Sequence, residues 1–302
     1  MRILVTGGCG FIGHHLVGRL VRDGHDVVVL DDLSNGVAQR LPAGVSLIHA
    51  DIANRAECGH AMAAVEACVH LAAIASVQVC MEDWTRATQV NLLGTVNVLA
   101  AASVAGNVPV VYASSAAVYG NQPPPAAEDS PCRPLGNYGI DKLASEHHAR
   151  GAGLATGLPS FGLRFFNVFG PGQDPNSPYS GVIARFAERL QGGRAARIFG
   201  DGRQSRDFVY VDDVVAAIMA ALGCASAEAP VANVCTGRDV DLLSLAGEIS
   251  DVLGEPQAPV FAPERSGDIR ESRGDPYLAE RLLGFRAQTQ LRDGLRKMLL
   301  ED

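Results

Sequence analysis

The chain has 302 residues, of which 47% are hydrophobic and 19% charged, with a formal net charge of −8. This length suffices for one large domain or two modest ones, and the composition is typical of a soluble globular protein. The acidic balance argues against a nucleic-acid-binding protein, since affinity for the phosphate backbone requires a basic face.

The first half alternates apolar, strand-like runs with amphipathic helical stretches. We predict strands over residues 2–6, 26–30, 45–49, 67–71, 108–114 and 160–166, and helices over 10–23, 85–105 and 138–151. Such alternation implies right-handed crossovers between parallel strands. It therefore predicts an α/β fold of the Rossmann type, a doubly wound parallel sheet with helices on both faces.

The pattern changes after residue 166. Residues 170–180 are rich in Gly, Pro, Asn and Ser, which indicates a loop. Shorter elements follow, with helices predicted over 183–190, 212–222 and 243–253 and a strand over 197–199. We expect a first domain of residues 1–166 and a smaller C-terminal α/β lobe of residues 167–302. The lobe, whose segments interleave with the first domain, would cover the carboxyl edge of the sheet, where doubly wound folds bind ligands.

A glycine-rich turn lies between the first strand and the first helix. Gly7, Gly10 and Gly13 are spaced G-x-x-G-x-x-G, which is weak evidence alone but is strengthened by this position. Bare backbone there approaches a pyrophosphate at the positive end of a helix. Asp31 follows the second strand, where a carboxylate accepts hydrogen bonds from the adenosine ribose and repels a 2′-phosphate. The turn therefore predicts NAD rather than NADP as the cofactor.

Other strand ends support a dinucleotide site. Asp51 and Ile52 follow the third strand and could bracket an adenine, while small residues after the fourth strand leave room for a dinucleotide at 71–73. Each is ordinary taken singly, but they reinforce one another in this order.

Tyr138 and Lys142 form a Y-x-x-x-K pair on a predicted helix, where positions i and i+4 share a face. A tyrosine titrates at about 10 and is a poor base at neutral pH. A nearby ammonium and a positive nicotinamide favour the phenolate and should lower that pKa. Such pairs are usually solvated, but this one uses one of only two lysines in the chain. Ser115, at the end of the fifth strand, is predicted to bridge the substrate and Tyr138.

These motifs, in this order over the whole chain, resemble the extended short-chain dehydrogenases/reductases, and specifically the NAD-dependent nucleotide-sugar epimerase/dehydratase family. The second half adds R-F-F-N-V-F-G-P at 164–171 and R-D-F-V-Y-V-D-D at 206–213. The resemblance implies that Asn167 contacts the sugar or diphosphate, that Arg206 and Arg265 hold the pyrophosphate, and that Asp268 binds the nucleoside ribose. Guanidinium groups are well suited to a diphosphate in an acidic chain.

The predicted sites are then as follows. The catalytic residues are Tyr138, Lys142 and Ser115. The cofactor residues are Gly7, Gly10, Phe11, Ile12, Asp31, Asn35, Asp51, Ile52, Leu71, Ala72, Ala73, Asn91, Tyr138, Lys142 and Phe165. The substrate residues are Ser76, Ser115, Tyr138, Asn167, Val182, Phe199, Arg206, Arg265, Asp268 and Ser272. The seven cysteines contain no C-x-x-C pair, so we expect free thiols and no metal site.

The reaction follows from what the resemblance implies. Family members share a first step, in which the tyrosine takes the C4 hydroxyl proton while C4 hydride passes to NAD⁺. Dehydratases of the family carry Asp-Glu just after the strand-five Ser/Thr, and related decarboxylases carry Glu at the second position. This chain has Ala116 and Ala117 there, which cannot transfer protons. We therefore predict a UDP-hexose 4-epimerase that interconverts UDP-glucose and UDP-galactose.

The preferred sugar stays open. Ser272 lies seven residues beyond Arg265, where related epimerases place a residue bordering the 2-substituent, and a serine leaves room for an N-acetyl group. Residues 173–176 (Q-D-P-N) also resemble epimerases acting on N-acetylhexosamines. Uronate 4-epimerases of the family tend towards Thr where this chain has Asn167, so UDP-glucuronate is a weaker alternative.

Other functions remain possible at this point. A 4-ketoreductase, a dehydratase or a dehydrogenase releasing NADH would use the same fold, and a small-molecule alcohol dehydrogenase would leave Arg206 and Arg265 without a diphosphate. A non-catalytic NAD-sensing regulator would not need Tyr138, Lys142 and Ser115 together. The resemblance further implies a homodimer through a four-helix bundle built on helices 85–105 and 138–151. We expect a cytoplasmic protein with no membrane partner, since no run of about 18 apolar residues and no signal peptide is evident.

Overall fold

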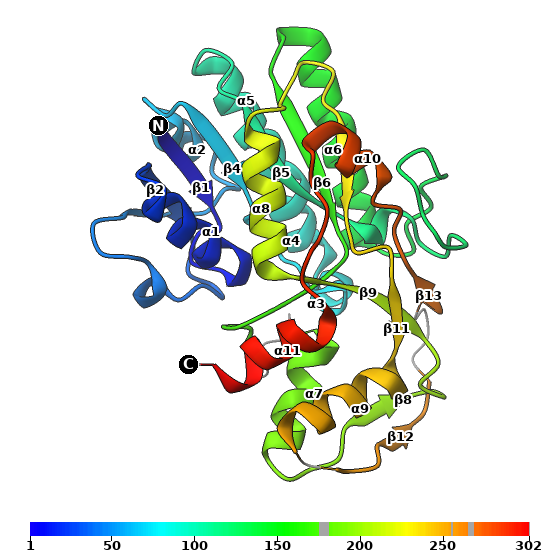
Figure 1. Cartoon of the computed structure of the whole chain (residues 1–302). Coiled ribbons are helices and arrows are strands. Elements are labelled where there is room, and N and C mark those ends of the chain that lie inside the picture. The colour runs from blue at the N-terminus through cyan, green and yellow to red at the C-terminus, as the bar shows by residue number, and fades with distance from the viewer. Residues whose placement is uncertain (175–180, 255, 265–268, 302) are drawn as a thin grey trace.

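The computed structural model describes residues 1–174, 181–254, 256–264 and 269–301. A seven-stranded parallel sheet runs through the upper part of the molecule in the order β10-β6-β5-β4-β1-β2-β3 (Figure 1). Its strands are β1 (Arg2–Thr6), β2 (Asp26–Asp31), β3 (Ser46–His49), β4 (Ala67–His70), β5 (Val110–Ser115), β6 (Ser160–Phe165) and β10 (Val231–Val234). The strand order reverses direction between β1 and β4. This topology confirms the predicted Rossmann-type fold and places a ligand crevice at the carboxyl ends of the strands.

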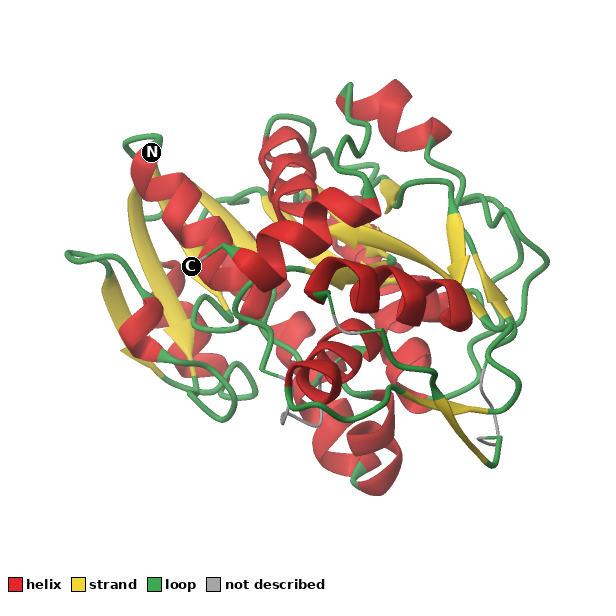
Figure 2. Cartoon of the chain, turned by 60° about the horizontal axis from the view of Figure 1, so that its bottom comes forward, coloured by secondary structure: helices red, strands yellow, loops and turns green. Residues whose placement is uncertain are grey.

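Helices cover both faces of this sheet (Figure 2). One face packs against α1 (Phe11–Arg22) and α8 (Val211–Leu222), which contribute apolar side chains such as Leu16 and Ile218 to a shared core. The other face packs against α2 (Arg55–Met62), α5 (Thr95–Val104) and α6 (Asn137–Thr156). Because the strands are buried on both faces, they appear in the sequence as continuous apolar runs.

The stretch predicted as one helix over 85–105 consists of three segments. α4 (Trp84–Thr88) leads into a π-helical segment, Gln89–Gly94, which leads into α5. Such wide turns often mark functional sites. By length and composition alone, the run Trp84–Val104 could cross a membrane, although 56% of its most apolar window is buried inside the protein. It packs between α2 and α6, as core helices of globular proteins do.

The C-terminal lobe lies below the carboxyl edge of the sheet in Figure 1. Its helices are α7 (Val182–Gln191), α9 (Leu242–Leu253) and α11 (Leu291–Leu300), which enclose a second core containing Phe186, Ile249 and Leu295. Its short strands are β7 (Asn167–Phe169), β8 (Arg197–Phe199), β9 (Ser205–Tyr210), β11 (Asp239–Asp241), β12 (Val260–Ala262) and β13 (Glu271–Ser272).

The lobe and the sheet domain share the second half of the chain. β10 pairs in parallel with β6, α8 packs on α1, and α10 (Tyr277–Leu283) packs on β10 and α8. These three elements come after residue 167 but belong to the sheet domain. The two lobes are therefore interleaved in sequence, and the chain crosses between them several times.

Candidate active site

Two glycines bring bare backbone to the end of β1. Gly7 has a positive φ of 72°, and a Cβ there would lie 2.6 Å from the backbone nitrogen of Ala72. A Cβ on Gly13 would lie 2.1 Å from the carbonyl oxygen of Gly7. Only glycine therefore allows α1 to begin this close to β1 and β4.

The first turn of α1 presents backbone amides that no capping side chain satisfies. Gly10 is the N-cap residue of this helix and has no side chain that could accept a hydrogen bond from these amides. The amide groups that begin a helix, here including those of Phe11 and Ile12, have no partner within the helix. Such amides, at the positive end of a helix, suit the pyrophosphate of a dinucleotide.

Asp31 is the last residue of β2 and is 6% exposed. Its carboxylate accepts hydrogen bonds from the backbone nitrogens of Cys9 and Leu33, both at 2.9 Å. Burial raises the pKa of this carboxyl, and these two hydrogen bonds oppose the rise. The carboxylate is thereby held beside the glycine turn, where an adenosine ribose would lie. Asn35 lies in the exposed turn that follows.

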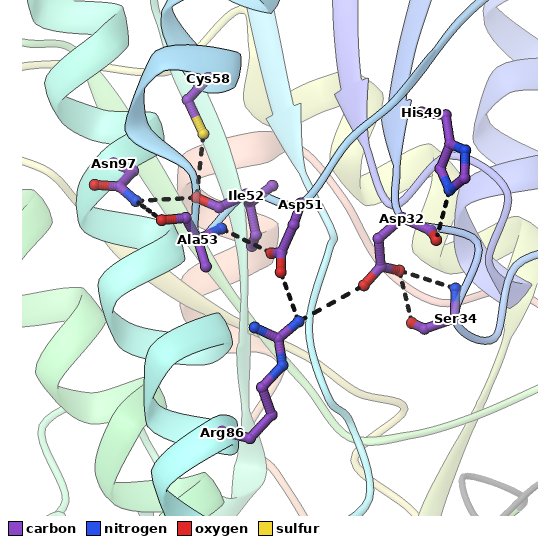
Figure 3. Close-up of polar contacts among 9 residues, drawn as sticks. All are labelled: Asp32, Ser34, His49, Asp51, Ile52, Ala53, Cys58, Arg86 and Asn97. Carbon is purple, nitrogen blue, oxygen red and sulfur yellow. Dashed lines mark hydrogen bonds and ion pairs between the residues drawn. The ribbon is translucent and has the colours of Figure 1, made fainter.

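The segment after β3 is held by polar contacts with side chains from two helices (Figure 3). Asp51 accepts a hydrogen bond from the backbone nitrogen of Ala53 at 2.8 Å and another from Arg86 at 2.6 Å. Ile52 is buried, and the Asn97 amide donates to the carbonyl oxygens of Ile52 and Ala53. Neither Arg86 nor Asn97 was predicted from the sequence, because neither belongs to a local motif.

The segment after β4 is fixed by a buried asparagine. Leu71, Ala72 and Ala73 are half-buried there. Asn91 is fully buried, and its side-chain amide bonds to both the backbone nitrogen and the carbonyl of Ile74, at 2.8 and 3.0 Å. In this arrangement Asn91 positions the cofactor-side loop, since its amide is engaged with the peptide of Ile74.

A buried histidine joins three elements beneath that loop. His70 ends β4, and its ring nitrogens lie 2.7 Å from the Thr6 hydroxyl and 3.0 Å from the Thr95 hydroxyl. Burial lowers the pKa of His70 to about 3, so the ring is neutral at physiological pH. No role was predicted for His70 from the sequence.

The predicted catalytic residues meet at the carboxyl end of β5. Tyr138 lies in the first turn of α6, and its hydroxyl is hydrogen-bonded to that of Ser115. Lys142 follows one turn later, with its Nζ 5.8 Å from the centre of the Tyr138 ring. Lys142 is 2% exposed, and its ammonium donates to the carbonyl oxygen of Ala113 at 2.9 Å. Ser115 also accepts a hydrogen bond from the backbone nitrogen of Ala117 at 3.1 Å.

Burial dominates the protonation of this pair in the protein without its cofactor. Burial raises the pKa of Tyr138 to about 12, and the hydrogen bond from Ser115 opposes the rise. Burial also lowers the pKa of Lys142 to about 8. The prediction that the ammonium and a positive nicotinamide together lower the pKa of Tyr138 concerns the protein with NAD bound, and it stays a prediction.

The sugar side is built on the small sheet of the lobe. Ser272 of β13 pairs in register with Arg206 of β9, and Asn167 of β7 pairs with Phe208 two residues further along β9. The structure thus brings three predicted substrate residues onto adjoining strands. The Arg206 guanidinium donates to the carbonyl oxygen of Ser205 at 2.8 Å.

The remaining predicted substrate residues are more scattered. Val182 begins α7, Phe199 ends β8, and the buried Ser76 caps α3 (Val77–Glu82) by accepting a hydrogen bond from Val79. Phe165 ends β6 and is buried in the core below the crevice. Arg265 and Asp268 lie outside the described residues, as do positions 175 and 176 of the Q-D-P-N segment.

A buried ion pair fixes α6 to the sheet. Glu146, one turn beyond Lys142, receives two hydrogen bonds from Arg164 of β6, at 2.9 and 2.7 Å, and one from Ser114 of β5. The catalytic helix is thereby joined to the two strands whose ends form the site. The i, i+4, i+8 spacing of Tyr138, Lys142 and Glu146 is the sequence signal that could have identified this role.

Ala116 and Ala117 begin a short 3₁₀ turn directly after Ser115. Their methyl groups leave this part of the site without a proton-transferring side chain. All seven cysteines are free thiols, and five of them are buried. Over the described parts of the chain, no group of three or more His, Cys, Asp or Glu side chains is arranged to hold a metal ion.

Residues 3–235 match the family model described as the NAD dependent epimerase/dehydratase family. The chain belongs to this family. A UDP-glucose 4-epimerase of Mycolicibacterium smegmatis is 41% identical over 305 residues, which cover 98% of this chain and 97% of the relative. A protein of Rhizobium meliloti named as a probable UDP-glucuronate 4-epimerase is 30% identical and covers 99% of this chain, with 96% of the relative covered.

Solved structures of epimerases agree with this family membership. A UDP-glucose 4-epimerase of Thermotoga maritima with UDP-glucose superposes with a TM-score of 0.96 at 34% identity, covering 100% of this chain and 98% of that one. A UDP-N-acetylglucosamine 4-epimerase of Methanobrevibacter ruminantium, in complex with UDP-N-acetylmuramic acid, superposes with a TM-score of 0.94 at 32% identity. The match covers 99% of this chain and 97% of that one. A UDP-glucose 4-epimerase of Thermus thermophilus in complex with NAD superposes with a TM-score of 0.92 at 35% identity. The match covers 100% of this chain and 98% of that one.

Membership in the epimerase/dehydratase family confirms several predictions. The protein is an NAD-dependent enzyme of the extended short-chain dehydrogenase/reductase type, and its close relatives are isomerases. The similar proteins bind UDP-sugars but differ in the sugar named. Family membership therefore defines the cofactor and the class of enzyme, and leaves the sugar to be argued from the site.

Proposed function

We propose that the protein is a UDP-hexose 4-epimerase, which inverts C4 of UDP-glucose and UDP-galactose through a transient 4-keto sugar. One observation carries the proposal: Ser115, Tyr138 and Lys142 meet at the end of β5, and the next two residues are Ala116 and Ala117. The site can therefore remove a hydroxyl proton at C4, but positions 116 and 117 offer no acid or base for elimination.

The protein side of the reaction follows from these contacts. The Tyr138 phenolate, hydrogen-bonded to Ser115, takes the proton of the C4 hydroxyl. Lys142, fixed by the carbonyl of Ala113, supplies positive charge beside the phenol. The glycine turn and Asp31 would hold NAD, which when bound would supply reversible hydride transfer at C4. Tyr138 then gives its proton back to the C4 oxygen, so both proton and hydride are restored and no second substrate is consumed.

Arg206 supports a diphosphate substrate. Its guanidinium emerges from β9 beside Ser272, and a dianionic diphosphate needs such a cation in a chain of net charge −8.

The proposal includes UDP-N-acetylglucosamine and UDP-N-acetylgalactosamine as further substrates. Ser272 is short, half-buried and paired in register with Arg206, so it borders the substrate side with little bulk. The similar Methanobrevibacter structure is named as a UDP-N-acetylglucosamine 4-epimerase. UDP-glucuronate is the alternative, and the Rhizobium relative named for that sugar supports testing it.

The experiment is a stereochemical assay. Purified NAD-loaded protein is incubated separately with UDP-glucose, UDP-N-acetylglucosamine and UDP-glucuronate, and the configuration at C4 is followed by proton NMR. We expect conversion to the galacto isomer without accumulation of NADH, and Tyr138→Phe as the inactive control. No C4 interconversion of any of the three would refute the epimerase proposal, whereas net NADH release would identify a dehydrogenase.

We propose, in addition, that the protein is a cytoplasmic homodimer formed through α5 and α6. Val104 and Leu154 lie on these neighbouring helices and are 84% and 82% exposed. An apolar groove between the helices includes Leu99, Ala100 and Gly151 in its lining. Burying this surface against a second copy would form a four-helix bundle. Seven free thiols agree with a reducing compartment.

A further inference from the structure

Three carboxylates gather where the adenosine end of the cofactor must lie. Asp31 ends β2, Asp32 follows it, and Asp51 lies just beyond β3. The charge of Asp32 adds to the burial that raises the pKa of the Asp31 carboxyl, so these groups repel one another. A dinucleotide brings further negative charge in its pyrophosphate. The crevice therefore needs a compensating cation at this end.

Arg86 reaches this cluster from α4. Its Nη2 lies 2.6 Å from Asp51 Oδ2 and 4.0 Å from Asp32 Oδ2, so one guanidinium spans the tips of β2 and β3 (Figure 3). The base of the side chain is fixed because Asp83 caps α4 and accepts a hydrogen bond from the Arg86 backbone nitrogen at 3.0 Å. The two carboxylates therefore hold the Arg86 guanidinium between the ends of β2 and β3.

The ion pairs of Arg86 with Asp51 and Asp32 contribute little to the stability of the fold. The side chains of Arg86, Asp51 and Asp32 are 40%, 31% and 35% exposed. Exposed ion pairs of this kind contribute roughly 0–1 kcal/mol to folding. Removing Arg86 should therefore leave the fold intact and change mainly the charge of the crevice.

We infer that Arg86 retains the adenosine end of NAD, by offsetting Asp32 and Asp51 and by holding the Asp51 carboxylate as an acceptor for the adenine amino group. The exocyclic amine of adenine is a donor, and Asp51 Oδ2 keeps lone-pair capacity beside the single hydrogen bond from Arg86. Arg86 is thus a positioning residue for the cofactor. The inference rests on NAD binding and is independent of the sugar.

The test measures cofactor retention in the holoenzyme. Arg86→Ala is compared with Arg292→Ala, which removes a similarly exposed arginine that pairs with Glu248 in the C-terminal lobe. The NAD-to-protein ratio after denaturation is measured by chromatography, and the release rate by exchange against isotopically labelled NAD. We expect Arg86→Ala to release NAD about tenfold faster, because the charges of Asp32 and Asp51 are then left uncompensated beside the cofactor. Arg292→Ala should match the wild type.

A second variant tests the charge argument. Asp32→Asn removes one carboxylate while keeping the oxygen that Ser34 contacts. Added to Arg86→Ala, it should restore at least part of NAD retention. Unchanged release from Arg86→Ala, equal acceleration in Arg292→Ala, or no rescue by Asp32→Asn would each overturn the inference. A loss of affinity confined to NADP would also overturn it and make Arg86 a 2′-phosphate ligand.

Discussion

Lys142 is a cation placed where an uncharged side chain would be more stable. Its ammonium is 2% exposed, and burial lowers its pKa from the ordinary 10.5 to about 8. Keeping it protonated in the folded chain at neutral pH therefore costs on the order of 3 kcal/mol. A buried cation of this kind is retained for its effect on Tyr138 and on the cofactor, at the expense of stability.

We predict that Lys142→Met abolishes activity and stabilises the NAD-free protein by about 2 kcal/mol at pH 7, after allowing about 1 kcal/mol for the lost hydrogen bond to Ala113. The difference should shrink as pH rises from about 8 to 10.5, because in that range the folded lysine has lost its proton while the unfolded one still holds it. Urea unfolding of both proteins at pH 7 and pH 10 measures this. A variant less stable than wild type at pH 7 would contradict it.

Tyr138 should ionise only when the cofactor is present. Burial raises its pKa to about 12, and a positive nicotinamide beside it should move that value downward. The ultraviolet absorbance of phenolate is titrated in wild type and in Tyr138→Phe, with and without NAD⁺, and the difference between the two proteins isolates this residue. We expect the difference band to appear at lower pH with NAD⁺. Identical curves in both conditions would show that the cofactor does not tune the phenol.

At the scale of elements, α1 and α6 have different tasks. α1 begins within van der Waals contact of β1, so its first glycines are spacers between backbone segments. α6 carries Tyr138 and Lys142 in its first two turns and is fixed by the buried ion pair of Glu146 with Arg164. Breaking a buried pair of this kind leaves an uncompensated charge. A shift of α6 relative to β5 that separated Glu146 from Arg164 would therefore cost much free energy.

Two glycines of α1 provide a matched pair of variants. Gly13→Ala places a Cβ 2.1 Å from the Gly7 carbonyl, so we expect it to destabilise the protein by about 1–3 kcal/mol and to lose NAD. Gly18→Ala meets only the flexible end of Arg22 at 3.6 Å, so we expect it to stabilise the helix by about 0.5–1 kcal/mol. Thermal unfolding and NAD content measure both. Equal effects of the two substitutions would contradict the spacing argument.

At the scale of the whole molecule, the exposed face of α5 and α6 predicts an assembly. Val104→Glu combined with Leu154→Glu should convert a dimer into a monomer, since it places four carboxylates in an apolar interface of two copies. Light scattering after gel filtration measures the mass, and Leu300→Glu, on the exposed face of α11, is the control. A dimer that persists in the double variant, or a wild-type monomer at micromolar concentration, would be inconsistent with this interface.

Much of the sheet domain and the cofactor turn could be predicted from the sequence. Its helices are long enough to show a period, its strands appear as continuous apolar runs, and Gly7 and Gly13 are read directly from their spacing. The pairing of Tyr138 with Lys142 is likewise local, because one helix presents positions i and i+4 together. Strands β9, β11 and β13 were not predicted, since β9 begins with three polar residues and β11 and β13 have only three and two residues.

The remaining features depend on contacts between residues far apart in the chain. Arg86 meets Asp32 and Asp51 only because α4, β2 and β3 converge at one edge, and β10 joins the sheet from beyond residue 167. The high pKa of Tyr138 likewise follows from how deeply the folded chain buries the phenol. The sequence by itself therefore determined the fold class and the cofactor turn and placed Tyr138 and Lys142 on one helix face, because these features depend on periodicity and local spacing. The tertiary structure decided their protonation and their supporting charges, because burial and electrostatic interactions depend on which distant segments pack together.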